Sequence, residues 1–267
     1  MGFITSVAGV SLAGMFNLAL ILKIGLLFWF LHSIAHPIND HIDRESDKIG
    51  RPNAPIPAKL VTLRQVKVII LLDYIIAVLL ILILPLNVLT RILATIFLVI
   101  TFIFSAPPIH TNARGILASI TIAIAFIIAF LGGWTEVVGK GFEVLLIPLS
   151  FLIGSTHIMA KIVVDIVDID SDKRSGRNTL PMQIGIKRSF YIATVFGLLI
   201  VFMYLLTYFI GNLNIIYLFL GGIGSVITLI GLFRFREDYG RELGREYYKI
   251  VTLPTYIFPI AIILGSV

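Results

Sequence analysis

The stretch "VTLRQVKVIILLDYIIAVLLILIL", residues 61 to 84, contains no proline or glycine, and after Lys67 its one charged residue is Asp73. About 20 mostly apolar residues are enough for a helix to cross the hydrocarbon core of a bilayer. In that environment every backbone N–H and C=O group must be satisfied within the protein, which favours a helix for so long an apolar run. The stretch therefore predicts a membrane-spanning helix.

Runs of this kind recur along the whole chain. Of its 267 residues, 58% are hydrophobic and 13% are charged, and the mean hydropathy is +1.02. Soluble domains carry about a quarter charged residues, so the composition excludes that class. The sequence predicts an all-α fold, a polytopic membrane protein with about nine transmembrane helices in a bundle that forms a single domain over residues 1–267. The predicted spans are residues 2–17, 19–37, 61–84, 88–105, 115–135, 143–164, 189–210, 214–233 and 250–266.

The basic residues predict the orientation in the membrane, because Lys and Arg near helix ends concentrate on the cytoplasmic side. The loops after the second, fourth, sixth and eighth spans share one side. All of the 21 basic residues except Lys23, Arg91 and Lys140 lie in or beside these loops. We therefore expect a multi-pass protein of the cell membrane with a cytoplasmic amino terminus and an outer carboxyl terminus. The first run lacks the positively charged leader of a secretory signal, so we expect it to be retained.

The acidic residues gather in two windows on the predicted cytoplasmic side. "NDHIDRESDK", residues 39–48, and "DIVDIDSDK", residues 165–173, hold eight of the fifteen acidic residues. The pattern DxxDxxxDK occurs in both at an offset of 125 residues, which indicates an internal duplication with motifs at 39–57 and 165–181. Four predicted spans separate the windows, so both face the same side. We expect them to form opposing walls of one cytoplasmic-side pocket.

The spacing within each window predicts a stripe of carboxylates, because offsets of three, four and seven residues share one face of a helix. Clustered carboxylates repel one another unless cations neutralise them. The chain has no cysteine, so a metal here would be held by oxygen or imidazole ligands. Mg²⁺ binds through carboxylates, water and substrate phosphates, which makes it the predicted cofactor. The predicted catalytic and metal-binding residues are Asp40, Asp43, Asp47, Asp165, Asp168 and Asp172.

Each acidic window is followed by a basic loop, "KIGRPNAPIP" at 48–57 and "KRSGRNTLP" at 173–181. Arg can bind phosphate through a bidentate fork, and Lys binds it as a point charge. A diphosphate held between the two walls would suit both the metal and these cations. The rule that sets the orientation also places basic residues here, so a purely topological role stays an alternative. The predicted substrate-binding residues are Asn39, Lys48, Arg51, Lys161, Lys173 and Arg177.

These motifs resemble those of the UbiA family of intramembrane prenyltransferases. "NDHIDRESD" at 39–47 and "RPNAPIP" at 51–57 are similar to the family's first motif, and "DIVDIDSDKRSGRNTLP" at 165–181 is similar to its second. The resemblance implies a Mg²⁺-dependent transfer of a polyprenyl group from its diphosphate to a lipid-soluble acceptor, inside a helical bundle with an opening towards lipid. Metal and cations would stabilise the leaving diphosphate. The acceptor would then capture the allylic cation, without a protein nucleophile.

The second motif and its Thr-Leu-Pro tail are most similar to archaeal digeranylgeranylglyceryl phosphate synthases. That likeness implies a geranylgeranyl donor and a geranylgeranylglyceryl phosphate acceptor in ether-lipid synthesis, with an aromatic acceptor of quinone synthesis as the alternative. The chain departs from the family pattern at Ala54, at Ala160 with Lys161, and in "FSAPPIHTNARG" at 104–115. The expected partners are these two substrates and membrane lipid, with no nucleic acid and no obligatory protein partner.

Two other classes of membrane protein use clustered carboxylates. A cation transporter would place its site near the midplane between inverted repeats, whereas these repeats are parallel and lie at a membrane face. A CDP-alcohol phosphotransferase would carry a DGxxAR element before its aspartates, and the sequence lacks it. Both remain distant alternatives to prenyl transfer.

Several polar residues outside the windows have open roles. Asp73 lies in the middle of a predicted span, where a carboxyl group indicates either a functional site or a neutral structural residue. His157 shares a helical face with Lys161 and could extend the pocket, while His32 and His36 lie before the first window; structural roles are expected for the histidines. The run at 233–249 is expected to be an interfacial helix or a cap over the pocket.

Overall fold

A computed structural model of the chain describes residues 1–174, 176–239 and 244–267. In this part of the chain the structure is helical throughout, and short loops connect the helices. The helices are α1 (Gly2–Leu12), α2 (Leu18–Ser33), α3 (Ala35–Ile42), α4 (Arg44–Gly50), α5 (Leu63–Ile83), α6 (Val88–Ser105), η1 (Thr111–Ala113), α7 (Ile116–Val138), α8 (Leu146–Val167), α9 (Ile169–Arg174), α10 (Leu180–Ile184), α11 (Ile186–Ile210), α12 (Ile215–Asp238), α13 (Gly244–Thr252) and α14 (Pro254–Gly265).

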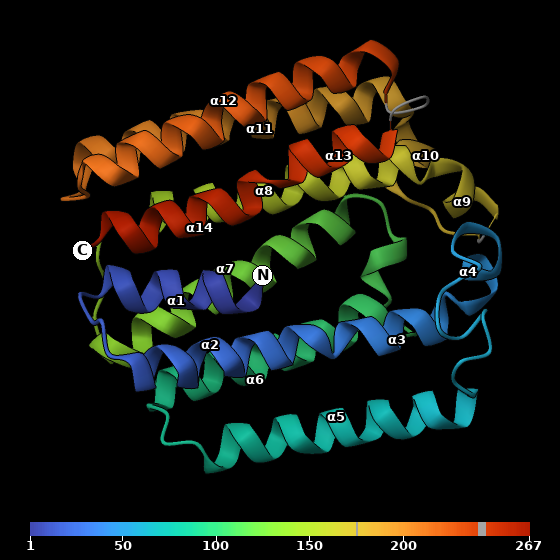
Figure 1. The fold of residues 1–267 in the computed structure, drawn as a ribbon, viewed down its shortest axis with the longest axis horizontal. Helices are drawn as coiled ribbons and strands as arrows, with labels where there is room; N and C mark the ends of the chain where they lie inside the picture. The colour runs from blue at the N-terminus through green and yellow to red at the C-terminus, as the bar shows by residue number, and fades with distance from the viewer. Residues whose placement is uncertain (175, 240–243) are drawn as a thin grey trace.

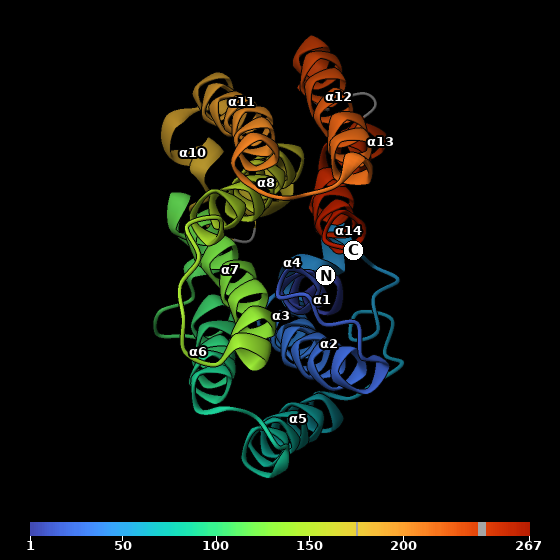
Figure 2. The same cartoon turned by 90° about the vertical axis from the view of Figure 1, so that its left-hand side faces the viewer.

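The long helices run side by side along one direction, as Figure 1 shows. The short helices α4 and α9 lie together at one end of the bundle, and the carboxyl terminus lies at the other. Seen along the bundle in Figure 2, α5 and α6 lie on one side and α11 and α12 on the opposite side, with α7 and α8 between them. The ends of several helices far apart in sequence therefore meet around α4 and α9.

Eight of the described helical segments are long and apolar enough to cross a membrane, which makes this a multi-pass membrane protein. They are Leu18–Ile42, Leu63–Ile83, Val88–Ser105, Ile116–Val138, Leu146–Val167, Ile186–Ile210, Ile215–Asp238 and Tyr248–Gly265. They match the second to ninth predicted spans to within a few residues. The first prediction differs, because α1 has 11 residues. At 1.5 Å per residue it is about half as long as the hydrocarbon core is thick.

Local signals explain why α1 ends at Leu12 and not at residue 17. Gly14 adopts a φ of +78°, in the left-handed region that glycine favours, and so takes the chain out of the helix. Asn17 then caps the next helix, because its side chain accepts a hydrogen bond from the backbone N–H of Leu20. The apolar run 2–17 is thus a short helix followed by a turn.

Close backbone packing fixes α1 against α7. A Cβ atom on Gly9 would lie 1.9 Å from the carbonyl oxygen of Phe130, and one on Gly133 would lie 1.8 Å from the carbonyl oxygen of Ser6. Small residues allow such approach of two helices in a membrane, where van der Waals packing and hydrogen bonds drive association. The pair α1 and α7 thereby forms part of the interior of the bundle.

The buried apolar residues form two clusters that share α7. Phe130 belongs to the cluster built with α8, α11, α12 and α14. Ile128 and Ala129 belong to the cluster built with α2, α3, α5 and α6. Because α7 contributes to both, the two halves of the bundle are packed as one body, and the two acidic motifs are held at a fixed separation.

Candidate functional site

Each acidic motif lies where a spanning helix ends and a short helix begins. Asp43 separates α3 from α4 with φ −86° and ψ 4°, and Asp168 separates α8 from α9 with φ −90° and ψ 7°. The next aspartate of each motif, Asp47 or Asp172, donates its backbone N–H to the carbonyl of that junction residue at 2.9 Å. The predicted continuous stripes therefore bend at their middle aspartate. The two motifs share one local conformation at the 125-residue offset.

The two motifs meet through Arg177, which follows α9. Its Nη2 donates to Asp43 Oδ2 of the first motif, and its Nη1 donates to Asp172 Oδ1 of the second at 3.1 Å. The side chains of the two aspartates are 10% and 4% exposed. The predicted opposition of the two aspartate motifs in one site is confirmed, and one guanidinium joins them.

Two further cations pair with three more of the carboxylates. Arg51 contacts Asp47 through two hydrogen bonds of 2.7 and 3.1 Å and contacts Asp40 at 3.3 Å. On α8, the Lys161 ammonium donates to Asp165, whose side chain is 3% exposed. Three of the five basic residues predicted to bind phosphate, Arg51, Lys161 and Arg177, thus contact carboxylates of the motifs.

Burial and pairing act in opposite directions on the charges of this site. Burial raises the pKa of Asp47, with a smaller opposing effect from Arg51. Burial also disfavours the charged form of Arg177, yet Asp43 and Asp172 outweigh it and raise the pKa of that guanidinium. Arg177 is therefore a permanent, half-buried cation between the motifs.

The other predicted site residues surround this cluster. Asn39 is half-buried on α3, and Asp168 is half-buried at the end of α8. Lys48 on α4 is exposed and lies 2.6 Å from Glu45, which is outside the repeated pattern. Lys173 on α9 is exposed at the same end of the bundle. The structure thus brings all twelve predicted residues to this end, with Lys161 lying deepest along α8.

The donor atoms of the site suit a hard divalent cation such as Mg²⁺, which prefers carboxylate and amide oxygen. Asp165 Oδ2 and Asn39 Oδ1 are buried and have no hydrogen-bond partner among the described residues, so both could accept a ligand. In residues 1–174, 176–239 and 244–267, no group of three acidic or histidine side chains is arranged to hold a metal. Arg51 and Arg177 lie between the carboxylates, so metal binding requires these side chains to move.

A third segment, in which no site residue was predicted from sequence, also reaches the site. The loop between α6 and α7 pairs with the second motif, because Gly115 N–H donates to Asn178 O at 2.9 Å and Asn178 N–H donates to Ala113 O at 3.2 Å. In this loop His110 adopts a left-handed φ of 43°, and its Nε2 is buried without a partner in the described chain. Burial lowers its pKa, while Asp43 raises it and Arg177 and Arg114 lower it further.

His110 was missed because its position depends on contacts with residues more than 60 positions away. The available signal was the departure of "FSAPPIHTNARG" from the family pattern, which marks a loop but no particular residue in it. The structure adds His110 to the candidates for contacting a bound anion.

A polar column continues from the site towards the membrane interior. Lys161 and His157 lie on α8 about one and two turns below Asp165, so the predicted face exists. The ring of His157 is stacked on Phe126, with centroids 3.7 Å apart, and His32 of α2 lies 5.1 Å from the same ring. His157 Nε2 has no hydrogen-bond partner within the described residues, so it could accept one from a ligand.

Asp73, which lies in a predicted span, does not join this cluster. Asp73 is half-buried on α5, a helix at the edge of the bundle. Of the expected cap at 233–249, residues 240–243 lie outside the described part of the chain. Residues 233–238 belong to the last turns of α12, and α13 begins at Gly244.

Comparisons with known proteins agree with this fold. The UbiA prenyltransferase family model matches residues 2–253. The digeranylgeranylglyceryl phosphate synthase of Pyrococcus horikoshii is 29% identical over 248 residues, which cover 92% of this chain and 84% of that protein. A UbiA homolog from Archaeoglobus fulgidus bound to DMAPP and Mg²⁺ has a TM-score of 0.73 at 18% identity, covering 98% of this chain and 94% of that one.

The same Archaeoglobus fulgidus homolog bound to GPP and Mg²⁺ also has a TM-score of 0.73, at 16% identity, over 98% of this chain and 95% of that one. Likeness at this identity shows a common fold. The family match extends over nearly the whole chain and includes both aspartate motifs. The chain therefore belongs to the UbiA prenyltransferase family and is a membrane-embedded prenyltransferase.

Proposed function

We propose that this prenyltransferase transfers a geranylgeranyl group from its diphosphate to geranylgeranylglyceryl phosphate in a Mg²⁺-dependent reaction. The observation that carries the proposal is the position of Arg177, which joins Asp43 of one motif to Asp172 of the other at the end of an apolar bundle. A site that alternates carboxylates and guanidinium groups can hold a polyanion together with its counter-cations.

The named relatives support the choice of substrates. The Pyrococcus horikoshii relative is a digeranylgeranylglyceryl phosphate synthase, and the Archaeoglobus fulgidus homolog was seen with DMAPP or GPP and Mg²⁺. Both ligands of that homolog are prenyl diphosphates, which is the donor class that the two aspartate motifs suit. The acceptor follows from the relative's name and from the Thr-Leu-Pro tail of the second motif.

The six aspartates of the repeated pattern would hold Mg²⁺, with Asn39 as a further oxygen donor. Bound there, Mg²⁺ supplies positive charge to the diphosphate oxygens as the allylic carbon–oxygen bond breaks. Arg51 and Arg177 now contact aspartates. With Mg²⁺ held by those carboxylates, the two guanidinium groups would be free to turn to the phosphate oxygens and bind them bidentately. His110, Lys48 and Lys173 lie around the same end and complete the anion site.

The bundle below the motifs suits the rest of the substrates. The allylic carbon must be captured by the acceptor oxygen before water reaches it, and an apolar interior excludes water. His157 and His32 give this interior polar groups that can accept a hydrogen bond, among aromatic neighbours such as Phe126. The proton released by the acceptor hydroxyl can pass to a carboxylate of the motifs or to the departing diphosphate.

The central experiment is a panel of donors and acceptors with the purified protein. Geranylgeranyl diphosphate is combined with geranylgeranylglyceryl phosphate or with an aromatic acid, with and without Mg²⁺, and both the product and the pyrophosphate are measured. We expect transfer to the glycerol lipid in the presence of Mg²⁺. Transfer to the aromatic acid alone would refute the proposed acceptor, and unchanged transfer in a chelator would refute the proposed metal.

Variants of the two motifs test the site itself. Asp43→Asn and Asp168→Asn should each lower the rate of pyrophosphate release by about 100-fold or more, because one ligand of the charge-stabilising group is lost. Glu45→Gln and Asp170→Asn are the matched controls, since both acids lie in the same windows but outside the repeated spacing and are exposed. Equal losses in the controls would mean that general negative charge, and not these positions, matters.

A further inference from the structure

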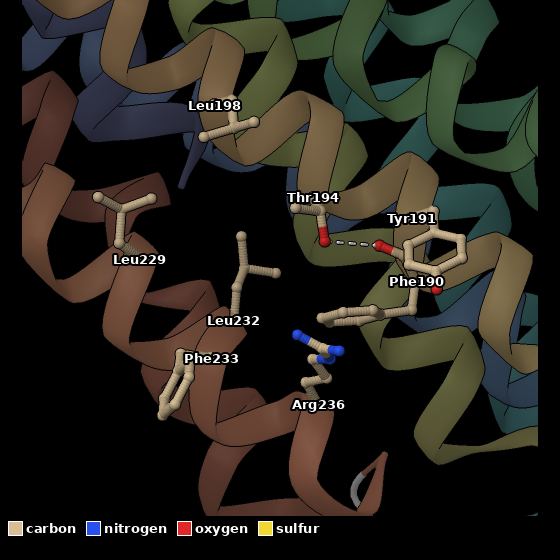
Figure 3. Close-up of a pocket in the computed structure, with 8 residues that line it drawn as sticks. All are labelled: Phe190, Tyr191, Thr194, Leu198, Leu229, Leu232, Phe233 and Arg236. Atoms are coloured by element: carbon tan, nitrogen blue, oxygen red, sulfur yellow. Dashed lines mark hydrogen bonds between the residues drawn. The ribbon is translucent and has the colours of Figure 1, made fainter.

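We propose that a groove between α11 and α12 binds an anionic phospholipid of the surrounding membrane, with a hydrocarbon chain in the groove and the phosphate on Arg236. The groove is a cavity of about 280 Å³ that is open to the outside of the bundle, and Figure 3 shows its lining side chains. No residue of either aspartate motif lines it, so it is separate from the prenyl-transfer site.

The groove has a polar end and an apolar end. From α11 it is lined by Tyr191, Thr194 and Leu198, and from α12 by Leu229 and Arg236, among others. These positions recur every three or four residues, so each set lies on one face of its helix. The helices are antiparallel, which places Leu198 beside Leu229 and places Tyr191 and Arg236 at the end nearer the motifs. A phospholipid matches this arrangement, because it has a polar headgroup at one end and hydrocarbon chains at the other.

The apolar part of the groove faces the hydrocarbon core. Leu198 is 56% exposed, Leu229 is 42% exposed and Phe233 is 65% exposed, and all three lie inside spanning segments. The one hydroxyl along this wall is satisfied, because Thr194 Oγ1 donates to the carbonyl of Phe190 at 2.9 Å. A cavity of about 150 Å³ can hold a benzene molecule, so this groove has room for part of a hydrocarbon chain.

The polar end carries a positive charge, and among the described residues no acidic group pairs with it. In the described part of the chain Arg236 has no acidic group within 4.0 Å, whereas its neighbour Arg234 lies 3.7 Å from Glu237. Lys187 and Arg188 are exposed and lie one turn before Tyr191 on the same face of α11. Arg236 thus lines the groove, and Lys187 and Arg188 lie one turn beyond it on α11, all three near the ends of two spanning segments. Positive charge at this end of an apolar groove suits an anionic phosphate.

The groove favours a resident lipid over a substrate. It opens sideways to the bilayer between two spanning helices, where membrane lipid is present at high concentration. The binding test needs no catalysis, so its failure would leave the proposed prenyl transfer untouched.

Native mass spectrometry of the purified protein, titrated with phosphatidylglycerol or with zwitterionic phosphatidylcholine, tests the headgroup. We expect preferential binding of phosphatidylglycerol, and Arg236→Gln should weaken it about fivefold. Arg234→Gln is the matched control, because this exposed arginine is two residues away but does not line the groove, and it should bind like the wild type. Equal binding of the two lipids, or equal losses in both variants, would overturn the proposal.

A second pair of variants tests the chain. Leu229→Trp should fill the groove and reduce phosphatidylglycerol binding, whereas Ile230→Trp, at the next position of the same helix, replaces an exposed residue that does not line the groove and should not. Normal binding in Leu229→Trp would contradict the assigned position. Geranylgeranylglyceryl phosphate is then added as a competitor. If it displaced phosphatidylglycerol at a concentration below that at which phosphatidylglycerol itself reaches half-maximal binding, the groove would be a substrate site and the proposal would be wrong.

Discussion

Arg177 is a single side chain that connects two halves of a site through two carboxylates. Its planar guanidinium can direct separate N–H groups to Asp43 and Asp172 at the same time. A lysine ammonium at this position has a similar charge but is a compact point, and it cannot keep the fork geometry. One conservative substitution, Arg177→Lys, can therefore separate the effect of the fork geometry from the effect of the positive charge.

We predict that Arg177→Lys raises the KM for the prenyl diphosphate about tenfold or more, because a bidentate contact is replaced by a point charge. The measurement is pyrophosphate release as a function of donor concentration. Arg174→Lys is the control, since Arg174 is an exposed arginine of the same segment. If both variants kept the wild-type KM, Arg177 would be a structural bridge without a role in donor binding.

The residues of the site could be predicted from sequence to the extent that spacing defines them. A repeated DxxDxxxD pattern indicated which carboxylates belong together, and the structure places them together. The pairing of Arg177 with Asp43 could not be predicted, because 134 residues separate them and the packing of the whole bundle brings them close. His110 could not be predicted for the same reason, because the groups around it come from segments that are far apart in the sequence.

Among the helices, the contact of α1 with α7 depends on glycine at two positions. A methyl group at Gly133 would lie 1.8 Å from the Ser6 carbonyl oxygen, so the helices must move apart to accept it. Gly222 of α12 differs, because a methyl group there would have Tyr204 Oη as its nearest neighbour at 3.5 Å, an ordinary contact.

We predict that Gly133→Ala destabilises the protein by about 1–3 kcal/mol, as overpacking does, and lowers the midpoint of thermal unfolding in detergent. Gly222→Ala should leave the midpoint unchanged or raise it slightly, because alanine favours the helix over glycine. Equal midpoints for the two variants would show that α1 and α7 are not closely packed in the membrane protein.

At the end opposite the motifs, a buried ion pair holds three elements together. Lys23 of α2 contacts Glu136 of α7 and donates to the carbonyl of Pro85 at 2.9 Å, and Asn87 N–H donates to Glu136 Oε2 at 3.0 Å. The Glu136 side chain is 5% exposed, so it depends on these partners for its charge.

We predict that Lys23→Met costs about 3 kcal/mol of stability, because it leaves a buried carboxylate without its cation. The double variant Lys23→Met with Glu136→Gln should recover part of that loss, since the amide oxygen can still accept from Asn87. Thermal unfolding in detergent measures both. Lys140→Met, which removes an exposed lysine, is the control; a loss as large in this variant would argue against a specific ion pair.

The helices themselves were predictable because a membrane span must be long, apolar and internally hydrogen-bonded. The positions at which these helices end were less predictable. The run 2–17 contains enough apolar residues for a span, yet Gly14 and Asn17 end one helix and begin the next within it. Likewise, the spacing of the aspartates predicted straight stripes, and the backbone at Asp43 and Asp168 interrupts both helices.

For the whole molecule, the distribution of charge defines an orientation. The connection between α4 and α5 lies at the motif end of the bundle, and the connection between α7 and α8 lies at the other end. Lys23 and Arg91, two of the three basic residues expected away from the cytoplasmic loops, have structural partners at that other end. Arg91 donates to the carbonyls of Leu82 and Leu84, at and just after the end of α5. A diphosphate does not cross a hydrocarbon core, so the motif end must face the compartment that supplies the donor.

We propose that this compartment is the cytoplasm, and the absence of cysteine allows a direct test. Ala58→Cys places one thiol in the connection after α4, and Val144→Cys places one in the connection before α8; both positions are exposed and neither substitution changes the charge. In intact cells a membrane-impermeant maleimide should label the Val144→Cys variant, while the Ala58→Cys variant should react after permeabilisation alone. The opposite pattern would place the aspartate motifs outside, and equal labelling of both in intact cells would contradict a single orientation.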